Sequence, residues 1–392
     1  MAIAVSSWFI DQLNSPSTEP VRTFTLGGSD YSDDITKWPR VKKSANEIRS
    51  VSVTIPLINI DGHLNGFYQN TYLIPSSATL EYGFTHPSSG DETIPIFSGF
   101  LNNVTYDEKT CQVHLRDKFW DFTHKIVGES SIPVSIGPEI PTDTIWTLCT
   151  CYGELSNITS TSNPDIDYAS FLTLAAQYSA DSVTIASHFD GQKVSQTVSA
   201  IMNHTDAKVW IEGDGKLNFK GFIEISSLDT TFTDDEISRL RIDVEKQRLI
   251  NTQHIDFNYS VSSDYWQNRV TSVSSTSVNT FSSHEDILQN ENVWYTTSSS
   301  ALSVAQKRVF LLNQPPRRFT VSTELSGLNM QIADTIRLVD SFFNVTSASG
   351  WQITEYSLDS DTGDIEWELD EAVAGDAFYL DVSTLDGDHL LL

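Results

Sequence analysis

The sequence predicts a mainly β protein with an α+β insert. Apolar and polar residues alternate in strand-like fashion over most of the 392 residues. Ser and Thr are abundant, and runs of helix-forming residues are few. Helical spacing of apolar residues is concentrated in one central stretch. A chain of this length has room for two to four domains of roughly 100–150 residues each.

Residues 1–125 are predicted to form an N-terminal β domain, either a sandwich or a barrel. The clearest strand is RSVSVTIPL, where Val51, Val53, Ile55 and Leu57 alternate with polar residues. Further strands are predicted at ATLEYGF, IPIFSGFLNNVTYD and TCQVHLRD. Residues 1–20 hold one short apolar segment and are expected to form an edge strand or an ordered tail.

Residues 126–245 are predicted to form an α+β domain with three helices and a hairpin. Thr142 is expected to cap the first helix, and the third helix is SQTVSAIMNHTD. The expected apolar stripes are Ile145, Leu148, Cys149 and Tyr152 in the first helix, and Ile166, Ala169, Leu172 and Ala176 in the second. The hairpin is KVWIEGDGKLNFKG, with Gly213-Asp214-Gly215 at its tip.

Residues 246–350 are predicted to return to sheet, and residues 351–392 to form a C-terminal β hairpin region. In FTVSTEL, Phe319, Val321 and Thr323 point to one side. WQITEYSL pairs with DIEWELDE across a turn rich in Asp and Gly. A helix is expected at 302–312. Its apolar stripe is Leu302, Ala305, Val309 and Leu312.

The net charge of −28 argues against a surface built to hold phosphates. It fits either a solubilising surface or a channel to which nucleic acid must not adhere. The first 130 residues carry 10 basic and 15 acidic residues and the remainder 14 and 37, so acidity is concentrated downstream. No apolar run approaches the ~18–20 residues of a membrane span. The first residues also lack the positive start of a signal peptide.

The chemistry-bearing residues form no recognisable catalytic pattern. The nine histidines lack the spacing of metalloproteases and deaminases, and neither a phosphate loop nor a nucleophile elbow occurs. The three cysteines, Cys111, Cys149 and Cys151, are expected to be buried free thiols in a protein made in a reducing cytoplasm. We expect no catalytic residue, no cofactor and no metal ligand, and therefore no enzyme. Carboxylate pairs for glycoside cleavage are not readable from sequence, so that alternative stays open.

A basic cluster contrasts with the acidic background. It comprises Lys37, Arg40, Lys42, Lys43 and Arg49, and Arg317 and Arg318 form a second, smaller group. These residues are either solvated or an interface that meets a neighbour's carboxylates. Asp359, Asp361, Gly363 and Asp364 fit either a calcium loop or a polar hairpin turn. The spacing lacks the distal Glu of an EF-hand, which favours the turn.

Four passages, taken in order, resemble the hub proteins of bacteriophage tails, which lie at the tail tip of siphophages and in the baseplate of contractile tails. They are QKRVFLL, FTVSTEL, ADTIRLVD and WQITEYSLDSDTGDIEWELDEA. The third element in that family begins with Gly-Asp, whereas Ala333 precedes Asp334 here. FSGFL followed by Val113–Asp117, and a helix followed by WIEGDGKLNF, also resemble the family pattern.

The resemblance implies two tail-tube-like β-barrel or sandwich domains, at 1–125 and 246–350. Three chains would then present six such domains to a sixfold tube, which implies a homotrimer. The implied function is structural: a virion protein at the tail tip, assembled in the host cytoplasm, that caps or continues the tube.

The implied partners are the tail tube or distal tail protein, tail-tip or fibre proteins, and the tape measure protein. Genomic DNA would pass through an acidic lumen without specific binding, and no membrane insertion is expected. The alternative is a carbohydrate-binding or carbohydrate-cleaving β-rich virion protein.

Overall fold

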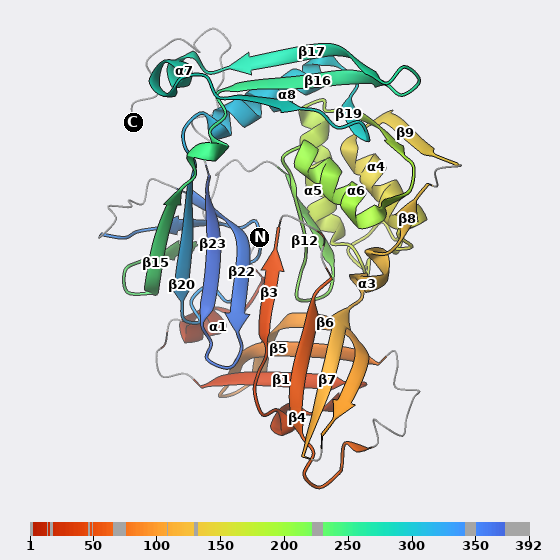
Figure 1. The fold of residues 1–392 in the computed structure, drawn as a ribbon. Helices are drawn as coiled ribbons and strands as arrows, with labels where there is room; N and C mark the ends of the chain where they lie inside the picture. Colours follow the sequence, from red (N-terminus) through yellow and green to blue (C-terminus); the bar gives the residue numbers. More distant parts are fainter. Residues whose placement is uncertain are drawn as a thin grey trace.

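Two larger sheets, a helical layer and a three-stranded sheet make up the described fold (Figure 1). The computed structural model describes residues 3–13, 15, 19–45, 48, 50–65, 76–107, 109–128, 132–221, 230–341 and 350–372. The predicted fold class is confirmed, because strands predominate and most of the longer helices lie in the central part of the chain.

The first sheet has the strand order β2-β1-β5-β6-β7-β4, with every neighbouring pair antiparallel. Its strands are β1 (Pro20–Leu26), β2 (Ser29–Asp30), β4 (Ser52–Ile58), β5 (Ser77–His86), β6 (Gly90–Tyr106) and β7 (Thr110–Asp117). A short 3-10 helix, η1 (Ser32–Asp34), follows β2. The predicted strand at RSVSVTIPL is confirmed as β4, because Val53, Ile55 and Leu57 are buried while Ser52 and Thr54 are exposed.

The N-terminal segment is a helix, α1 (Ser7–Leu13), rather than the predicted edge strand or tail. Ser6 Oγ accepts a hydrogen bond from the Phe9 amide at 3.1 Å, which caps the helix start. Phe9 packs edge-on against Phe84 of β5, with ring centroids 5.2 Å apart. One buried aromatic side chain thus fixes the segment on the first sheet.

The second sheet has the order β14-β21-β22-β23-β20-β15. β3 pairs with the second half of β22, whose first half pairs with β21. Its strands are β3 (Arg40–Ser44), β14 (Thr230–Phe232), β15 (Ile237–Val244), β20 (Arg317–Thr323), β21 (Thr335–Leu338), β22 (Gly350–Asp359) and β23 (Ile365–Ala372). The predicted β22–β23 hairpin and the alternation in β20 are confirmed.

The boundaries expected at 245 and 350 do not separate the sheets. Strands from 230–244, 317–338 and 350–372 belong to the same sheet, and β3 joins them from the N-terminal part. The hairpin after residue 350 is central in this sheet because its strands find partners on both sides. Residues 373–392 lie outside the described part of the chain.

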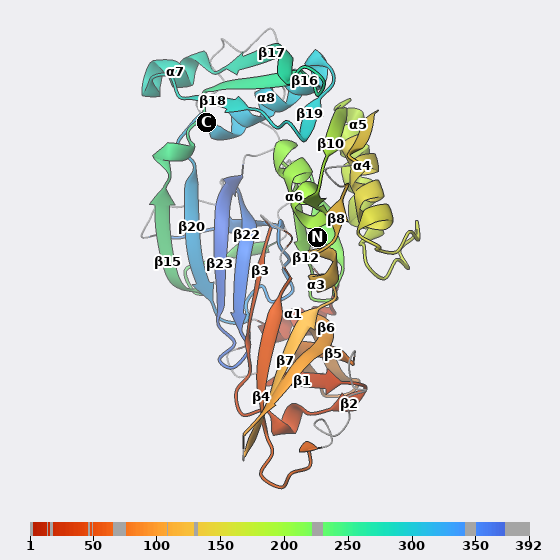
Figure 2. The same cartoon turned by 45° about the vertical axis from the view of Figure 1, so that its right-hand side comes forward.

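The helical layer stands beside the two sheets (Figure 2). Its helices are α3 (Phe119–Phe122), α4 (Pro141–Thr147), the π-helix η3 (Leu148–Tyr152), α5 (Tyr168–Ala180) and α6 (Val194–His204). Its strands are β8 (Ile126–Val127), β9 (Val134–Glu139), β10 (Ile185–Phe189), β11 (Gln192–Lys193), β12 (Lys208–Ile211) and β13 (Leu217–Lys220). The predicted hairpin at 208–221 is confirmed as β12–β13.

Two details of this layer differ from the prediction. Helix α5 buries Phe171, Leu174 and Tyr178, whereas Leu172 of the predicted stripe is half exposed. Larger side chains displace Ala from the buried stripe because they remove more apolar area from water. Thr142 is buried inside α4 rather than capping it.

Cys111 and Cys149 are buried as predicted, but Cys151 is exposed.

Residues 245–316 form a unit inserted between β15 and β20, which are antiparallel neighbours in the second sheet. The unit contains η4 (Lys246–Arg248), β16 (Thr252–Ser260), β17 (Tyr265–Val273), α7 (Ser275–Phe281), β18 (Glu285–Leu288), β19 (Val293–Tyr295) and α8 (Ser298–Leu312). Strands β17, β16 and β18 make the three-stranded sheet, which lies away from the first sheet in Figures 1 and 2. Helix α8 confirms the predicted helix, although Leu302 is partly exposed.

Buried apolar side chains gather into two separate cores. The first fills the space between the two larger sheets and includes Phe24, Tyr82, Phe319, Trp351 and Trp367. The second joins the helical layer to the inserted unit and includes Phe122, Ile201, Phe219, Tyr295 and Val304. The described fold therefore has two separate hydrophobic cores.

His204, at the end of α6, is a polar group inside the second core. Its ring stacks on Tyr295, with centroids 4.5 Å apart, and neither ring nitrogen has a hydrogen-bond partner among the described residues. Burial, assisted by the Arg308 guanidinium, lowers the pKa of His204 to about 3. The imidazole is therefore neutral in the folded protein at neutral pH.

The His204 environment predicts a loss of stability in acid. An unfolded chain protonates this imidazole below about pH 6.5, while the folded chain resists until about pH 3. The folded state therefore loses roughly 2–3 kcal/mol between pH 6.5 and 4.5 from this group. We expect His204→Phe to show a correspondingly smaller loss over that range in urea unfolding. The exposed His124 is the control, and equal behaviour of His124→Phe would contradict the assignment.

Candidate functional site

The basic cluster singled out in the sequence lies mainly on β3, beside the acidic hairpin β22–β23. Arg40 and Lys42 point outward, and Lys42 Nζ lies 2.5 Å from Glu355 while Arg40 lies 3.4 Å from Glu366. Lys37 is exposed ahead of the strand, and Arg49 lies outside the described residues. The outward part of the cluster thus meets carboxylates of its own chain.

Lys43, the next residue on β3, points inward and is 6 % exposed. Its ammonium contacts the Glu212 carboxylate at the tip of the β12–β13 hairpin and lies 5.2 Å from the Tyr356 ring centroid. Burial alone would lower the pKa of Lys43, but the Glu212 carboxylate more than offsets this, so the pKa is raised. The Lys43 ammonium is therefore paired inside its own chain, and its part in an interface stays a prediction.

Glu212 accepts hydrogen bonds in addition to its ion pair with Lys43. Its Oε1 accepts a hydrogen bond from the Gly213 amide at 2.8 Å, and its Oε2 accepts one from Trp210 Nε1 at 3.0 Å. These donors satisfy the buried carboxylate, which a buried charge requires. Local sequence patterns do not reveal this ion pair, because Lys43 and Glu212 lie far apart in the chain.

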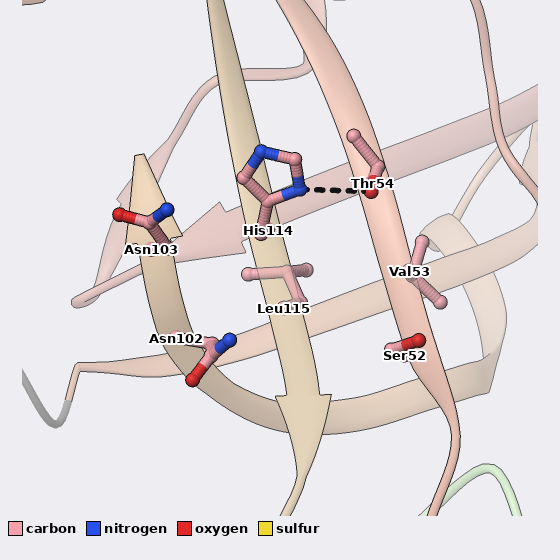
Figure 3. A pocket seen from close by; sticks show the side chains of 7 residues that line it. All are labelled: Ser52, Val53, Thr54, Asn102, Asn103, His114 and Leu115. Atoms are coloured by element: carbon pink, nitrogen blue, oxygen red, sulfur yellow. Dashed lines mark hydrogen bonds between the residues drawn. The ribbon is translucent and has the colours of Figure 1, made fainter. Parts of the chain in front are cut away.

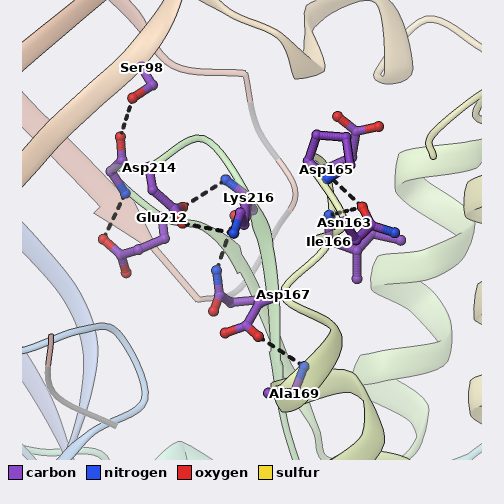
Figure 4. A network of polar contacts seen from close by, with 12 residues as sticks. Ser98, Asn163, Asp165, Ile166, Asp167, Ala169, Glu212, Asp214 and Lys216 are labelled. Carbon is purple, nitrogen blue, oxygen red and sulfur yellow. Dashed lines mark hydrogen bonds and ion pairs between the residues drawn. The ribbon is translucent and has the colours of Figure 1, made fainter. Parts of the chain in front are cut away.

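The same hairpin tip rests on strand β6 of the first sheet (Figure 4). Ser98 Oγ donates a hydrogen bond to the Gly213 carbonyl at 2.7 Å. A Cβ atom at position 213 would lie 1.9 Å from the Pro95 carbonyl oxygen, so only glycine fits there. The hairpin therefore reaches from the helical layer to both larger sheets.

Arg317 and Arg318, at the start of β20, belong to a second ionic cluster. Arg317 contacts Glu371, and its guanidinium lies 5.2 Å from the Trp351 ring centroid. Arg318 Nε donates to Asp370 at 2.9 Å. Arg248 donates to the same Asp370 carboxylate at 3.1 Å, and burial opposed by these two arginines leaves the pKa of Asp370 lowered. Arg317 and Arg318 thus both form ion pairs with carboxylates of their own chain.

The outer face of the second sheet carries a central acidic strip. Glu355 and Glu368 are directly opposite on β22 and β23, and burial together with the Glu355 charge raises the pKa of Glu368. Glu366 and Asp370 continue the strip. Basic residues lie toward the two edges: Arg239 and Arg241 on β15, and Arg40 and Lys42 on β3.

The outer face of the first sheet has a different character. A depression of about 340 Å³ is lined by Ser52, Val53, Thr54, Asn102, Asn103, His114 and Leu115, none of them acidic (Figure 3). His114 lies between Thr54 Oγ1, 3.0 Å from Nδ1, and Thr105 Oγ1, 2.7 Å from Nε2. Hydroxyl, amide and imidazole groups thus replace charge on this face.

In the two larger sheets, two long strands, β4 and β15, leave one side of their backbone without a strand partner along most of their length. Among the described strands, β15 pairs only with β20, and β4 pairs only with β7. A single contact from Thr36, whose amide donates to the Pro56 carbonyl at 3.0 Å, covers one end of β4. Edges of this kind present donors and acceptors to another chain.

The Asp-rich turn between β22 and β23 has the hydrogen bonds of a hairpin turn. The Gly363 amide donates to the Asp359 carbonyl at 2.8 Å, and the Asp361 amide to Asp359 Oδ1 at 3.0 Å. Ser360, inside the turn, is buried and donates its amide to the Pro39 carbonyl at 3.2 Å. The turn thus packs against the segment leading into β3. Among the described residues, no cluster of three metal-ligand side chains occurs.

Comparisons with known proteins identify the fold. No family model matches the sequence, and no curated protein does either. Among solved structures, the chain is similar to a tail protein from Neisseria meningitidis MC58. The TM-score is 0.54 and the identity 13%, over 90% of this chain and 96% of the other.

Two further structures extend this similarity. The 43 kDa tail protein of prophage MuSo2 from Shewanella oneidensis has a TM-score of 0.52 and 13% identity, over 92% of this chain and 99% of the other. A prophage tail protein from Listeria monocytogenes EGD-e has a TM-score of 0.50 and 11% identity, over 89% and 94%. The chain has the fold of these proteins over almost its whole length.

The buried pair predicts a characteristic pattern of stability changes. Lys43→Met leaves the Glu212 charge buried without its cation and should cost about 3–5 kcal/mol in free energy of unfolding. Adding Glu212→Gln to Lys43→Met should recover more than half of that loss, because no buried charge then remains. Urea unfolding followed by circular dichroism measures both. A double variant no more stable than Lys43→Met would refute a mutual ion pair.

Proposed function

We propose that this chain, whose fold is that of prophage tail proteins, is a hub protein at the tip of a bacteriophage tail. The observation that carries the proposal is the similarity over nearly the full length of both chains in each comparison. The same elements that resemble hub proteins in sequence, β20, β21 and the β22–β23 hairpin, together form the centre of the second sheet. The protein acts as a structural part of the virion rather than as an enzyme.

The proposed assembly is a closed ring of three chains. Each chain supplies two large sheets, so three chains supply six, matching a sixfold tail tube. The open sides of β4 and β15 support such a ring, since different edges of neighbouring chains can meet head to tail. Outward-facing Arg239 and Arg241 at the β15 edge would also discourage pairing with unsuitable strands.

The proposed channel is lined by the outer face of the second sheet. Its acidic strip, Glu355, Glu366, Glu368 and Asp370, would repel the phosphates of passing DNA. Salt screens such repulsion over ~8–10 Å, so the effect requires carboxylates close to the DNA path. The depression on the first sheet, whose lining carries no acidic residue, would then meet neighbouring protein.

The proposed partners are the tail tube or distal tail protein on one side and tail-tip or fibre proteins on the other. The tape measure protein would meet the ring before DNA passes. In the described parts of the chain, no helix is long and apolar enough to cross a membrane.

A second candidate function, carbohydrate binding, rests on the depression around His114. Its hydroxyl and amide groups suit neutral sugars, and Trp120 is exposed beyond Arg116 on the same side. Titration with neutral oligosaccharides tests this candidate, and binding abolished by Asn103→Ala would favour it over the hub assignment.

The trimer predicts a defined mass in solution. Light scattering on the purified chain at high concentration should give three times the 43.7 kDa of one chain. Negative-stain imaging should show a threefold ring with a pore. Each interface should bury at least the ~1,200–2,000 Å² of a standard contact. A monomer at all concentrations, together with tails holding six copies or one, would overturn the proposed assembly.

The channel assignment predicts DNA retention after charge reversal. Assembled rings carrying Glu366→Lys and Glu368→Lys should retain double-stranded DNA at 50 mM salt and release it at roughly 0.5 M salt, because phosphate binding falls steeply with salt. Wild-type rings should not retain DNA. Asp33→Lys with Asp121→Lys is the matched control, because it changes the net charge equally on other surfaces. Equal retention by the control would show that total charge, rather than this face, governs the effect.

A further inference from the structure

The described residues form two separate apolar cores, and ion pairs link the bodies built around them. The first core unites the two larger sheets, and the second unites the helical layer with the inserted unit. Inside each body, large side chains such as Trp351 and Tyr295 are fully buried. Contacts between separately cored bodies of one chain resemble transient protein interfaces, for which relative motion is the usual behaviour.

Four ion pairs link the two bodies away from the β12–β13 hairpin tip, one of them between Arg318 of β20 and Glu245 at the start of the inserted unit, 3.5 Å apart. Lys118, after β7, lies 3.0 Å from Asp165 of the helical layer. Lys220, at the end of β13, lies 3.5 Å from Asp334 of the second sheet. Arg248 in η4 lies 3.1 Å from Asp370 of β23. The four cationic side chains keep between 23% and 40% of their surface in water. Asp334 is fully buried, whereas the other three pairs are partly exposed on both sides, so each of these three contributes little stability and is screened by salt.

The β12–β13 hairpin joins the bodies in a different way. Val209, Ile211 and Phe219 belong to the second core, whereas Trp210 belongs to the first. The hairpin tip holds the buried Glu212, paired with Lys43, and Gly213, packed on Pro95. This contact is buried and closely packed, so it is the point at which the bodies are least free to separate.

We propose that the protein consists of two rigid bodies that pivot about the β12–β13 hairpin, with the four ion pairs between them acting as latches. The closed orientation of the structure is the latched one. Breaking the latches lets the helical layer and the inserted unit swing relative to the two sheets, while both cores stay intact. This inference stands independently of the proposed place of the chain in a virion.

Spin labels placed on the two bodies test the pivot directly. Cys151 is the one exposed cysteine and lies in the helical body, and the exposed Asn103 of β6 can be replaced by cysteine. Electron–electron resonance on the full chain then reports the distance between Cys151 and Asn103→Cys. At low salt we expect one narrow distance distribution.

Loss of the latches should create a second, longer distance. In Lys118→Met with Lys220→Met, we expect the open population to rise roughly threefold to tenfold, in keeping with the loss of two of the four latches. The wild-type chain in 0.5 M NaCl should change in the same direction, which keeps the test valid if the variant fails to fold. Arg241→Met is the control, because it removes an ion pair that lies wholly within β15 and is more exposed than the latches.

A label pair inside one body separates pivoting from general loosening. Ser29→Cys and Asn103→Cys, with Cys151→Ser, place both labels on the first sheet. This distance should stay unchanged under every condition. If the distance between the labels at Cys151 and Asn103→Cys stays unchanged both in the double variant and at high salt, the pivot is overturned. Equal broadening of the pair within the first sheet would overturn it as well.

Discussion

The rest of the structure depends on the buried contact between Lys43 and Glu212, because three parts of the fold meet there. Lys43 lies on β3, which leaves the first sheet to join the second, and Glu212 lies on the hairpin from the helical layer. Moving two charges out of water is costly, so such a pair persists only where every hydrogen-bonding group is satisfied. Trp210, Gly213 and Tyr356 supply those contacts. The pair thereby fixes one relative position of β3 and the hairpin.

The acidic and basic residues of this chain are not spread evenly over its surface. Five basic residues, Arg40, Lys42, Lys43, Arg317 and Arg318, all face carboxylates of the same chain. Three carboxylates of the acidic strip, Glu355, Glu366 and Asp370, are thus paired with cations, and Glu368 at its centre forms no ion pair among the described residues. In contrast, hydroxyl and amide groups dominate the outer face of the first sheet around the depression. The two sheets thus present chemically different faces to their surroundings.

Local sequence patterns predicted many of the strands and helices. They did not predict which residues far apart in the chain contact one another. β4, β20 and the β22–β23 hairpin followed from the two-residue alternation of their own side chains. The buried face of α5 could not be predicted in this way, because Leu172 and Leu174 fit helical apolar stripes equally well. Which of the two is buried depends on the packing of α5 against Phe219. The seven basic residues were grouped by their proximity in sequence. The partners of five of them, Glu212, Glu355, Glu366, Asp370 and Glu371, come from segments that only the folded chain brings near.

The position of β3 in the second sheet affects how the chain is made. Its partner β22 begins at residue 350, so β3 leaves the ribosome long before that strand exists. At roughly 5–20 residues per second, the delay is about fifteen seconds to one minute. During this interval the apolar side of Val41 and the ammonium of Lys43 have no place to be buried. The first sheet can form early around its own strands, but the second must wait for the end of synthesis. Nascent chains are therefore vulnerable to aggregation at β3, and a holding chaperone that binds there would raise the yield of folded protein.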